Sequence, residues 1–197
     1  MNKLQDIQSI GPMAGGDAGE QGPIKTEYEK GKKLLEQGKH GEAAVALHNA
    51  LLGYEEKNDE VGMANASNQL GHLCVAREDF DKAEEHYGRT RELCEKLDDP
   101  LSLFALSKVL VDVYIGQKKY DKAINTCLDN LDVYRGNNDP RGAIEVMEKM
   151  ADIYLLAGQK DKAADTCMTI ASIHRNFKHA GIADSFEKKA AELKEAC

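Results

Sequence analysis

Cysteine and histidine are the residue types in this sequence best suited to nucleophilic or metal chemistry, so their spacing is considered first. The five cysteines are widely separated and include no Cys-x-x-Cys pair, the spacing of zinc knuckles and redox motifs: Cys74, Cys94, Cys127, Cys167 and Cys197. The six histidines include no closely spaced pair typical of a helical zinc site: His40, His48, His72, His86, His174 and His179. There is also no phosphate-binding glycine loop. We therefore expect no enzyme activity, no metal and no cofactor.

The charge balance is acidic, which narrows the classes of partner. Lysine and arginine number 26 against 34 acidic residues, giving a net charge of −8. Nucleic acids and anionic membranes both attract basic surfaces, so neither is expected as a partner. No stretch approaches the roughly 20 apolar residues of a membrane span. The first ten residues lack the apolar core of a secretory signal, and we expect a cytoplasmic protein.

A period of 40 residues organises most of the chain. It is clearest at four alanines that open similar segments, Ala43, Ala83, Ala123 and Ala163. Twelve residues before each alanine stands a residue that is mostly small: Gly31, Gly71, Val111 and Ala151. Four residues after each alanine stands a residue of an apolar column: Leu47, Tyr87, Cys127 and Cys167. Small side chains let two helices approach closely, so the pattern predicts tightly packed helix pairs. The cysteines in these columns are then core residues, since a free cysteine packs as a small hydrophobe.

Helix starts and turns keep the same period. Asp59, Asp99 and Asp139 are 40 residues apart, and Pro100 and Pro140 follow the last two. Aspartate is a favoured N-cap and proline suits the first helical position, so each pair predicts the start of a repeat's first helix. Glycines between the apolar runs indicate the turn inside a repeat: Gly38, Gly116 and Gly158.

These signals predict two helices in each repeat. First helices are expected near residues 24–37, 61–77, 101–117 and 141–157. Second helices are expected near residues 41–57, 80–97, 120–136 and 160–177. The stretch 180–196 is rich in lysine and glutamate and predicts a helix that caps the last apolar face.

The residues before the repeats have a different composition. Residues 11–23 are rich in glycine and proline, which is typical of a flexible linker. Upstream, Leu4, Ile7 and Ile10 recur every three residues. This pattern is compatible with a short amphipathic segment that docks in the protein's own groove or a neighbour's, or with a disordered terminus.

The repeat resembles the tetratricopeptide repeat. The clearest copies are Leu70-Gly71-x-x-Cys74 with Phe80-Asp81-Lys82-Ala83, and Leu110-Val111-x-x-Tyr114 with Tyr120-Asp121-Lys122-Ala123. The usual repeat has about 34 residues, so this chain is similar to a longer-repeat branch of that family. The resemblance implies an all-α, right-handed superhelical solenoid of helix-turn-helix repeats with a C-terminal capping helix. Residues 1–23 would form a tail and residues 24–197 a single domain, with repeats at about 24–58, 61–98, 101–138 and 141–178.

In that family the first helices line a concave groove that binds ligands. Carried over by column, the resemblance implies a groove lined by Lys25, Tyr28, Lys32, Leu35, Asn65, Asn68, His72, Val75, Ala105, Lys108, Asp112, Ile115, Glu145, Glu148, Asp152 and Leu155. The charge changes from lysines in the first repeat to acids in the fourth. One hypothesis is a polarised groove for an extended or helical segment with an acidic and a basic end. The alternative is an ordinary solvated surface.

The implied function is a protein-protein interaction module, such as a scaffold, adaptor or chaperone-like subunit, that binds a protein or peptide segment. A regulatory sensor for a small peptide or signal ligand is a second hypothesis. A self-assembling structural protein, with weak self-association through a repeat edge or the tail, is a third. Fold alone does not identify the partner.

Overall fold

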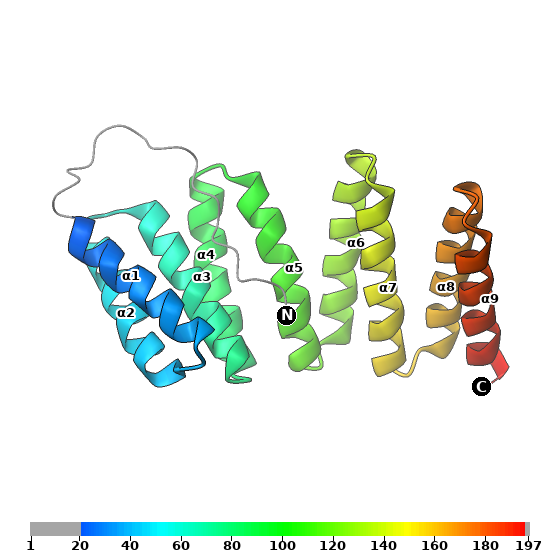
Figure 1. The fold of residues 1–197 in the computed structure, drawn as a ribbon, viewed down its shortest axis with the longest axis horizontal. Helices are drawn as coiled ribbons and strands as arrows, with labels where there is room; N and C mark the ends of the chain where they lie inside the picture. The colour runs from blue at the N-terminus through cyan, green and yellow to red at the C-terminus, as the bar shows by residue number, and fades with distance from the viewer. Residues whose placement is uncertain (1–20, 196–197) are drawn as a thin grey trace. The chain divides into compact units, whose positions relative to one another are not determined.

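The computed structural model describes residues 21–195, and in that range the chain forms nine α-helices (Figure 1). The first helices of the repeats are α1 (Gln21–Glu36), α3 (Glu60–Ala76), α5 (Pro100–Gly116) and α7 (Pro140–Leu156). The second helices are α2 (His40–Glu56), α4 (Phe80–Lys96), α6 (Tyr120–Gly136) and α8 (Lys160–Asn176), and α9 (Ala180–Glu195) follows. The predicted helices and the all-α repeat fold are confirmed. The largest difference is at α1, which begins at residue 21 rather than 24.

The described residues divide into two compact units. The first ends at Gln117 and holds α1 to α5, and the second begins at Lys118 and holds α6 to α9. Within each unit, consecutive helices pack against one another. The boundary falls inside the third predicted repeat, and the prediction of a single domain over residues 24–197 stays a prediction. The predicted docking residues Leu4, Ile7 and Ile10, and Cys197, lie outside the described residues.

Aspartate side chains begin three of the first helices, as the sequence predicts. Each carboxylate accepts a hydrogen bond from a backbone N–H three residues later: Asp59 from Gly62 at 2.9 Å, Asp99 from Ser102 at 3.0 Å and Asp139 from Gly142 at 3.0 Å. Pro100 and Pro140 occupy the first turn of α5 and α7, where no backbone donor is lost. The caps therefore fix where each of these helices begins.

A left-handed residue closes each turn, at intervals of 20 residues. These residues are Gly38, Asn58, Glu78, Asp98, Lys118, Asn138, Gly158 and Lys178. Glycine adopts this conformation without strain, which explains Gly38 and Gly158. Gly116 was predicted as a turn residue, and that prediction is wrong because it ends α5 while Lys118 makes the turn. A Cβ at Gly116 would lie 2.4 Å from Cζ of Phe80, so its smallness serves packing instead.

Small residues let neighbouring helices approach closely, as the alternating columns predict. A Cβ at Gly71 would lie 2.4 Å from Cε1 of Tyr87, and one at Gly31 would lie 2.7 Å from Cγ of Leu47. Both partners are fully buried. Each large side chain thus fills space that a glycine on the facing helix leaves open.

A second set of contacts repeats this rule at the start of the next first helix. A Cβ at Gly62 would lie 2.2 Å from Cδ1 of Tyr54. Forty residues later the corresponding residues are Ser102 and Cys94, a larger residue beside a smaller one. The two columns therefore change size in opposite directions, because the volume they share is fixed.

We predict that Gly62→Ser destabilises the protein by about 1–3 kcal/mol, because its side chain would overlap the Tyr54 ring. In a Tyr54→Cys background, which copies the Cys94 and Ser102 pair, Gly62→Ser should cost less than it does in the wild type. Urea denaturation of both single variants and the double variant measures the coupling, expected to be about 1 kcal/mol. Additive effects of the two substitutions would contradict shared volume.

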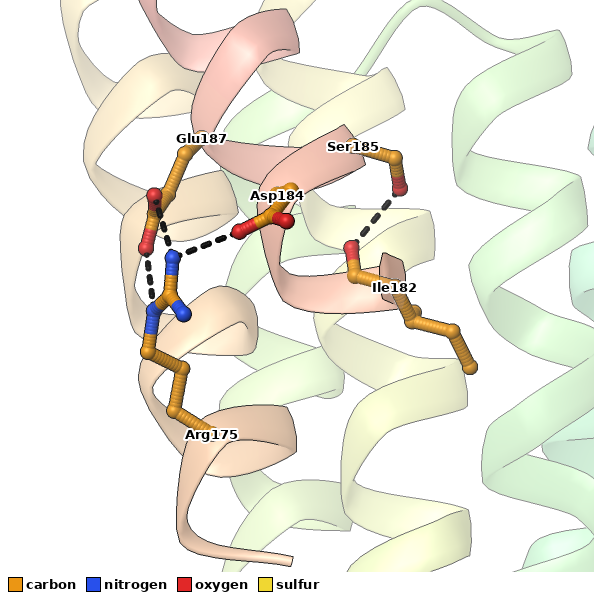
Figure 2. Close-up of polar contacts among 5 residues, drawn as sticks. All are labelled: Arg175, Ile182, Asp184, Ser185 and Glu187. Atoms are coloured by element: carbon orange, nitrogen blue, oxygen red, sulfur yellow. Dashed lines mark hydrogen bonds and ion pairs between the residues drawn. The ribbon is translucent and has the colours of Figure 1, made fainter. Parts of the chain in front are cut away.

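Helix α9 is held on α8 by charged side chains as well as by apolar contacts. Figure 2 shows the Arg175 guanidinium of α8 between two carboxylates of α9. Its Nε donates to Glu187 at 2.8 Å, and one terminal nitrogen donates to Asp184 at 2.6 Å and to Glu187 at 2.9 Å. Ala183 and Ala190 of α9 are buried, and Ala190 packs beside Ala164 and Cys167 of α8. The cap predicted from the sequence therefore covers the last second helix.

Acid should loosen this cap. The hydrogen bond from Arg175 holds the pKa of Glu187 below its ordinary value of 4.5. A lowered folded-state pKa stabilises the fold above about pH 4.5 and loses that effect as pH falls through the folded value. We predict that the hydrogen-exchange protection of α9 falls between pH 6 and pH 3, after correction for intrinsic exchange rates.

Two substitutions complete this test. Arg175→Gln should lower the protection of α9 at pH 6 and remove most of its pH dependence. Lys188→Gln is the matched control, because among residues 21–195 Lys188 pairs with Glu192 of its own helix, at 3.8 Å. Equal pH dependence in the Arg175→Gln variant and in the wild type would show that this ion pair does not hold the cap.

Candidate ligand-binding face

The first unit carries a polar stripe on α3. Asn65, Asn68 and His72 lie three and four residues apart, so they share one face of the helix. Asn68 is only 5% exposed, while Asn65 and His72 are half-buried. Within the described residues, Oδ1 of Asn65 is shielded from solvent and accepts no hydrogen bond. Because Asn65 as a whole is only half-buried, its side chain could turn outward, and the amide oxygen would then accept a hydrogen bond from a ligand.

His72 is fixed by a residue of the next helix. A hydrogen bond of 2.8 Å joins its Nδ1 to the hydroxyl of Tyr87 on α4, and the two rings meet edge to face. Tyr87 is fully buried, and burial raises the pKa of its phenol well above the ordinary value. The negative charge of Asp112 on α5 raises it further. The hydroxyl therefore stays protonated and orients the imidazole.

The predicted residues of α1 are less open than the pattern suggests. Tyr28 belongs to the core, where its ring packs edge to face on Tyr54 at 6.3 Å between centroids. Lys32 lies over the Tyr28 ring at 5.4 Å and pairs with Glu29 at 3.5 Å. Lys25 is exposed. Helix α1 therefore presents the positive charges of Lys25 and Lys32, and the buried Tyr28 ring packs beneath Lys32.

The two charged residues predicted on α5 are exposed. Lys108 and Asp112 are four residues apart on one helix face. The Lys108 ammonium lies 4.9 Å from the centre of the Phe104 ring, which provides a cation–π contact. The first unit thus brings positive, amide and imidazole groups onto its first helices.

The second unit presents acids on α7. Glu145, Glu148 and Asp152 are exposed and share one helix face. Lys189 of α9 approaches Asp152, with 3.7 Å between Nζ and Oδ1. The cap helix therefore offsets part of the negative charge that the sequence assigns to this stripe.

The four described cysteines are buried and unbridged: Cys74, Cys94, Cys127 and Cys167. Burial raises the pKa of the Cys94 thiol to about 11, and the neighbouring charge of Asp99 acts in the same direction. These thiols are core side chains, as predicted. Across residues 21–195, no cluster of three or more histidine, cysteine or acidic side chains is placed to hold a metal. No helix in that range has the length and apolarity to cross a bilayer.

Two residues that matter for these stripes were missed in the sequence. The column of Tyr87 predicts a core residue, but a buried tyrosine hydroxyl also needs a hydrogen-bond partner. The Tyr87 ring packs on Gly71, and His72 is the next residue along the chain. That adjacency could have suggested the pair. Lys189 lies in a lysine-rich helix, and nothing in its spacing indicates a contact with Asp152.

The His72–Tyr87 bond gives a prediction about stability. His72→Leu leaves the buried Tyr87 hydroxyl without this partner and should cost about 1–3 kcal/mol. Tyr87→Phe removes the hydroxyl itself and should cost less. The double variant, compared by urea denaturation, should be no less stable than His72→Leu alone. A double variant that loses the sum of both single effects would contradict the pairing.

Comparison with known proteins shows similarity of structure but not of sequence family. No protein-family profile matches the chain, and no curated protein matches it in sequence. A kinesin-light-chain-like protein of Podospora anserina with nearly identical TPR-like repeats superposes with a TM-score of 0.66 and 14% identity, over 88% of this chain and 92% of that one. The MamA protein gives a TM-score of 0.51 and 20% identity, over 88% of this chain and 98% of that one.

A third similar structure is a signal-transduction ATPase of the STAND class, PH0952 from Pyrococcus horikoshii, which has a tetratricopeptide repeat sensor. Its TM-score is 0.57 at 20% identity, over 86% of this chain and 29% of that one. At such identities the likeness establishes architecture alone. The architecture is nevertheless the same in all three structures, and this chain therefore has the fold of the tetratricopeptide-type repeat proteins.

Proposed function

We propose that this chain is a protein-interaction module, acting as a scaffold, adaptor or chaperone-like subunit, and that the first helices of its repeats bind a segment of another protein. Repeat folds of this type expose extended surfaces suited to such segments. The proposal is binding rather than catalysis, because the polar groups on these helices offer hydrogen bonds and charge and no activated nucleophile.

The unpaired amide of Asn65 is the observation that carries the proposal. A shielded acceptor without a donor costs the free protein about 1–3 kcal/mol. With the half-buried Asn65 side chain turned outward, a backbone N–H of a bound segment would supply the missing donor without requiring one side-chain sequence. Asn68 and the oriented imidazole of His72 extend the same stripe along α3.

The charges of the two units suit segments of different charge. Lys25, Lys32 and Lys108 of the first unit favour acidic side chains. Glu145 and Glu148 of the second unit favour basic ones, and Asp152 does so less because Lys189 is beside it. Such charges act mainly on selectivity and association rate, so they should decide which segments bind.

A regulatory sensor is the second candidate function. It is favoured by the likeness to PH0952, in which a tetratricopeptide repeat region is the sensor. The same α3 stripe would then hold a short peptide or signal molecule. The adaptor and the sensor functions differ in the size of the ligand. Screening peptides and small molecules in parallel for binding to the chain distinguishes the two functions.

The test uses Asn65→Ala. Peptides selected from a random library on the wild-type chain should bind the variant more weakly by about 1 kcal/mol, roughly fivefold in Kd. The free energy of unfolding of the unliganded variant should be unchanged or higher, because the substitution removes an unpaired oxygen. Fluorescence anisotropy and urea denaturation measure the two quantities.

Asn125→Ala is the matched control, since Asn125 is exposed on the second helix α6. It should leave peptide affinity unchanged. Glu148→Lys combined with Asp152→Lys should weaken peptides with basic residues and spare the others. Failure to enrich any peptide, or equal affinity for wild type and Asn65→Ala, would refute binding at this stripe.

A further inference from the structure

Helix α2 exposes an apolar stripe on a surface that the proposed function does not use. Val45 is 62% exposed and Leu52 is 47% exposed, and His48 lies between them on the same helix face. Three and four residues separate these side chains, so they form one continuous strip about 10 Å long. We call Val45, His48 and Leu52 the α2 stripe.

The other repeats serve as an internal control for this stripe. At the position of Val45 they carry exposed polar residues, Glu85, Asn125 and Asp165. At the position of Leu52 they also carry exposed polar residues, Glu92, Asp132 and Ser172. The fold therefore does not require apolar residues at either position. Their presence in the first repeat alone indicates a local contact that covers them.

The stripe adjoins a cavity of about 450 Å³ within the first unit. Val45 and His48 line it from α2, Leu70 and Leu73 line it from α3, and His86 lines it from α4. Its walls are mainly apolar, with imidazole groups among them. Such a cavity accepts an aliphatic side chain more readily than a charged one.

The start of α1 lies beside one end of this stripe. A Cβ at Gly53 would lie 2.9 Å from Cγ1 of Ile24, so the first turn of α1 packs on α2 at the residue after Leu52. In Figure 1, α1 and α2 lie side by side along their length. The described part of α1 therefore begins near the end of α2 that carries Leu52. Residues 11–20 could span about 33 Å when extended, well beyond the stripe's length.

That preceding chain contains an apolar pattern of matching size. Leu4, Ile7 and Ile10 recur every three residues, with polar residues between them. We propose that residues 1–10 pack on the α2 stripe of the same chain, with aliphatic side chains covering Val45 and Leu52 and one of them entering the adjoining cavity. The contact is intramolecular, because the tether keeps the segment at a high local concentration. Leu70 and Leu73 of α3 contribute to this contact from another face of the helix, so the stripe of Asn65, Asn68 and His72 stays available.

Val45→Glu combined with Leu52→Glu tests the proposal directly. It copies Glu85 and Glu92 of the second repeat, so the repeat itself shows that the fold accepts both residues. Hydrogen–deuterium exchange of the whole chain should show amides 4–10 exchanging at least about fivefold slower in the wild type than in this variant. Equal exchange in the two proteins would overturn the proposal.

Leu101→Glu is the matched control, because Leu101 is 75% exposed on α5 and lies outside the stripe. It should leave the exchange of residues 4–10 as in the wild type. From the other side of the contact, Leu4→Ser combined with Ile7→Ser should shift the methyl resonances of Val45 and Leu52 in NMR spectra. Unchanged resonances would count against the contact even if the stripe variant unfolded.

Light scattering at several concentrations identifies which copy supplies the segment. A mass of 21.7 kDa throughout, together with protected amides 4–10, supports packing within one chain. A doubled mass that returns to the monomer value in Val45→Glu/Leu52→Glu would assign the stripe to a contact between two copies. That result would overturn the intramolecular proposal while leaving the proposed function of the first helices untouched.

Discussion

Close approach of consecutive helices is the constraint on which the rest of this structure depends. A large side chain can be fully buried only where the facing helix lacks one, as Tyr87 is against Gly71 and Leu47 against Gly31. The same rule joins successive repeats through Tyr54 and Gly62. Because each helix is followed by a turn of fixed geometry, these contacts recur at set intervals. One local packing rule therefore recurs through the repeats of each unit.

Side chains outside the repeated core columns are less constrained by packing, and they differ from repeat to repeat. On α3 the result is an amide and imidazole stripe that includes an acceptor without a donor. On α7 it is a set of acids moderated by Lys189. On α2 it is exposed Val45 and Leu52, at two positions where the other repeats are polar. Core columns repeat because packing constrains them, and surface columns vary because it does not.

The first and last helices of the described residues differ in how the outermost helix faces are covered. At the C-terminal end, α9 covers α8 with small buried residues and an arginine clasp, and its remaining surface is rich in charge (Figure 2). At the other end, α1 begins close to the apolar stripe of α2. Charged side chains make the outer surface of α9 polar. Near the other end, the exposed apolar side chains of the α2 stripe would be stabilised by a segment that packs on them.

Much of the architecture was determined by the sequence alone, because its causes are local. The 40-residue columns specify which face of each helix is buried, and the Asp-Pro pairs specify where helices begin, since caps act within one turn. For the same reason the buried cysteines could be assigned to the core. For the candidate stripes, the sequence predicted the helix and the face of the helix, but not the atoms that each side chain contacts.

Only the tertiary structure decided the contacts between residues that are distant in the chain. Gly116 is read in sequence as a turn, yet Phe80, 36 residues earlier, makes it a packing residue. Tyr87 orients His72, and Lys189 approaches Asp152. Both contacts depend on how the helices pack, because packing sets the directions of these side chains. The unpaired oxygen of Asn65 is also a property of its surroundings. Periodicity determines which face a side chain occupies, but only the packed helices determine which atoms it meets.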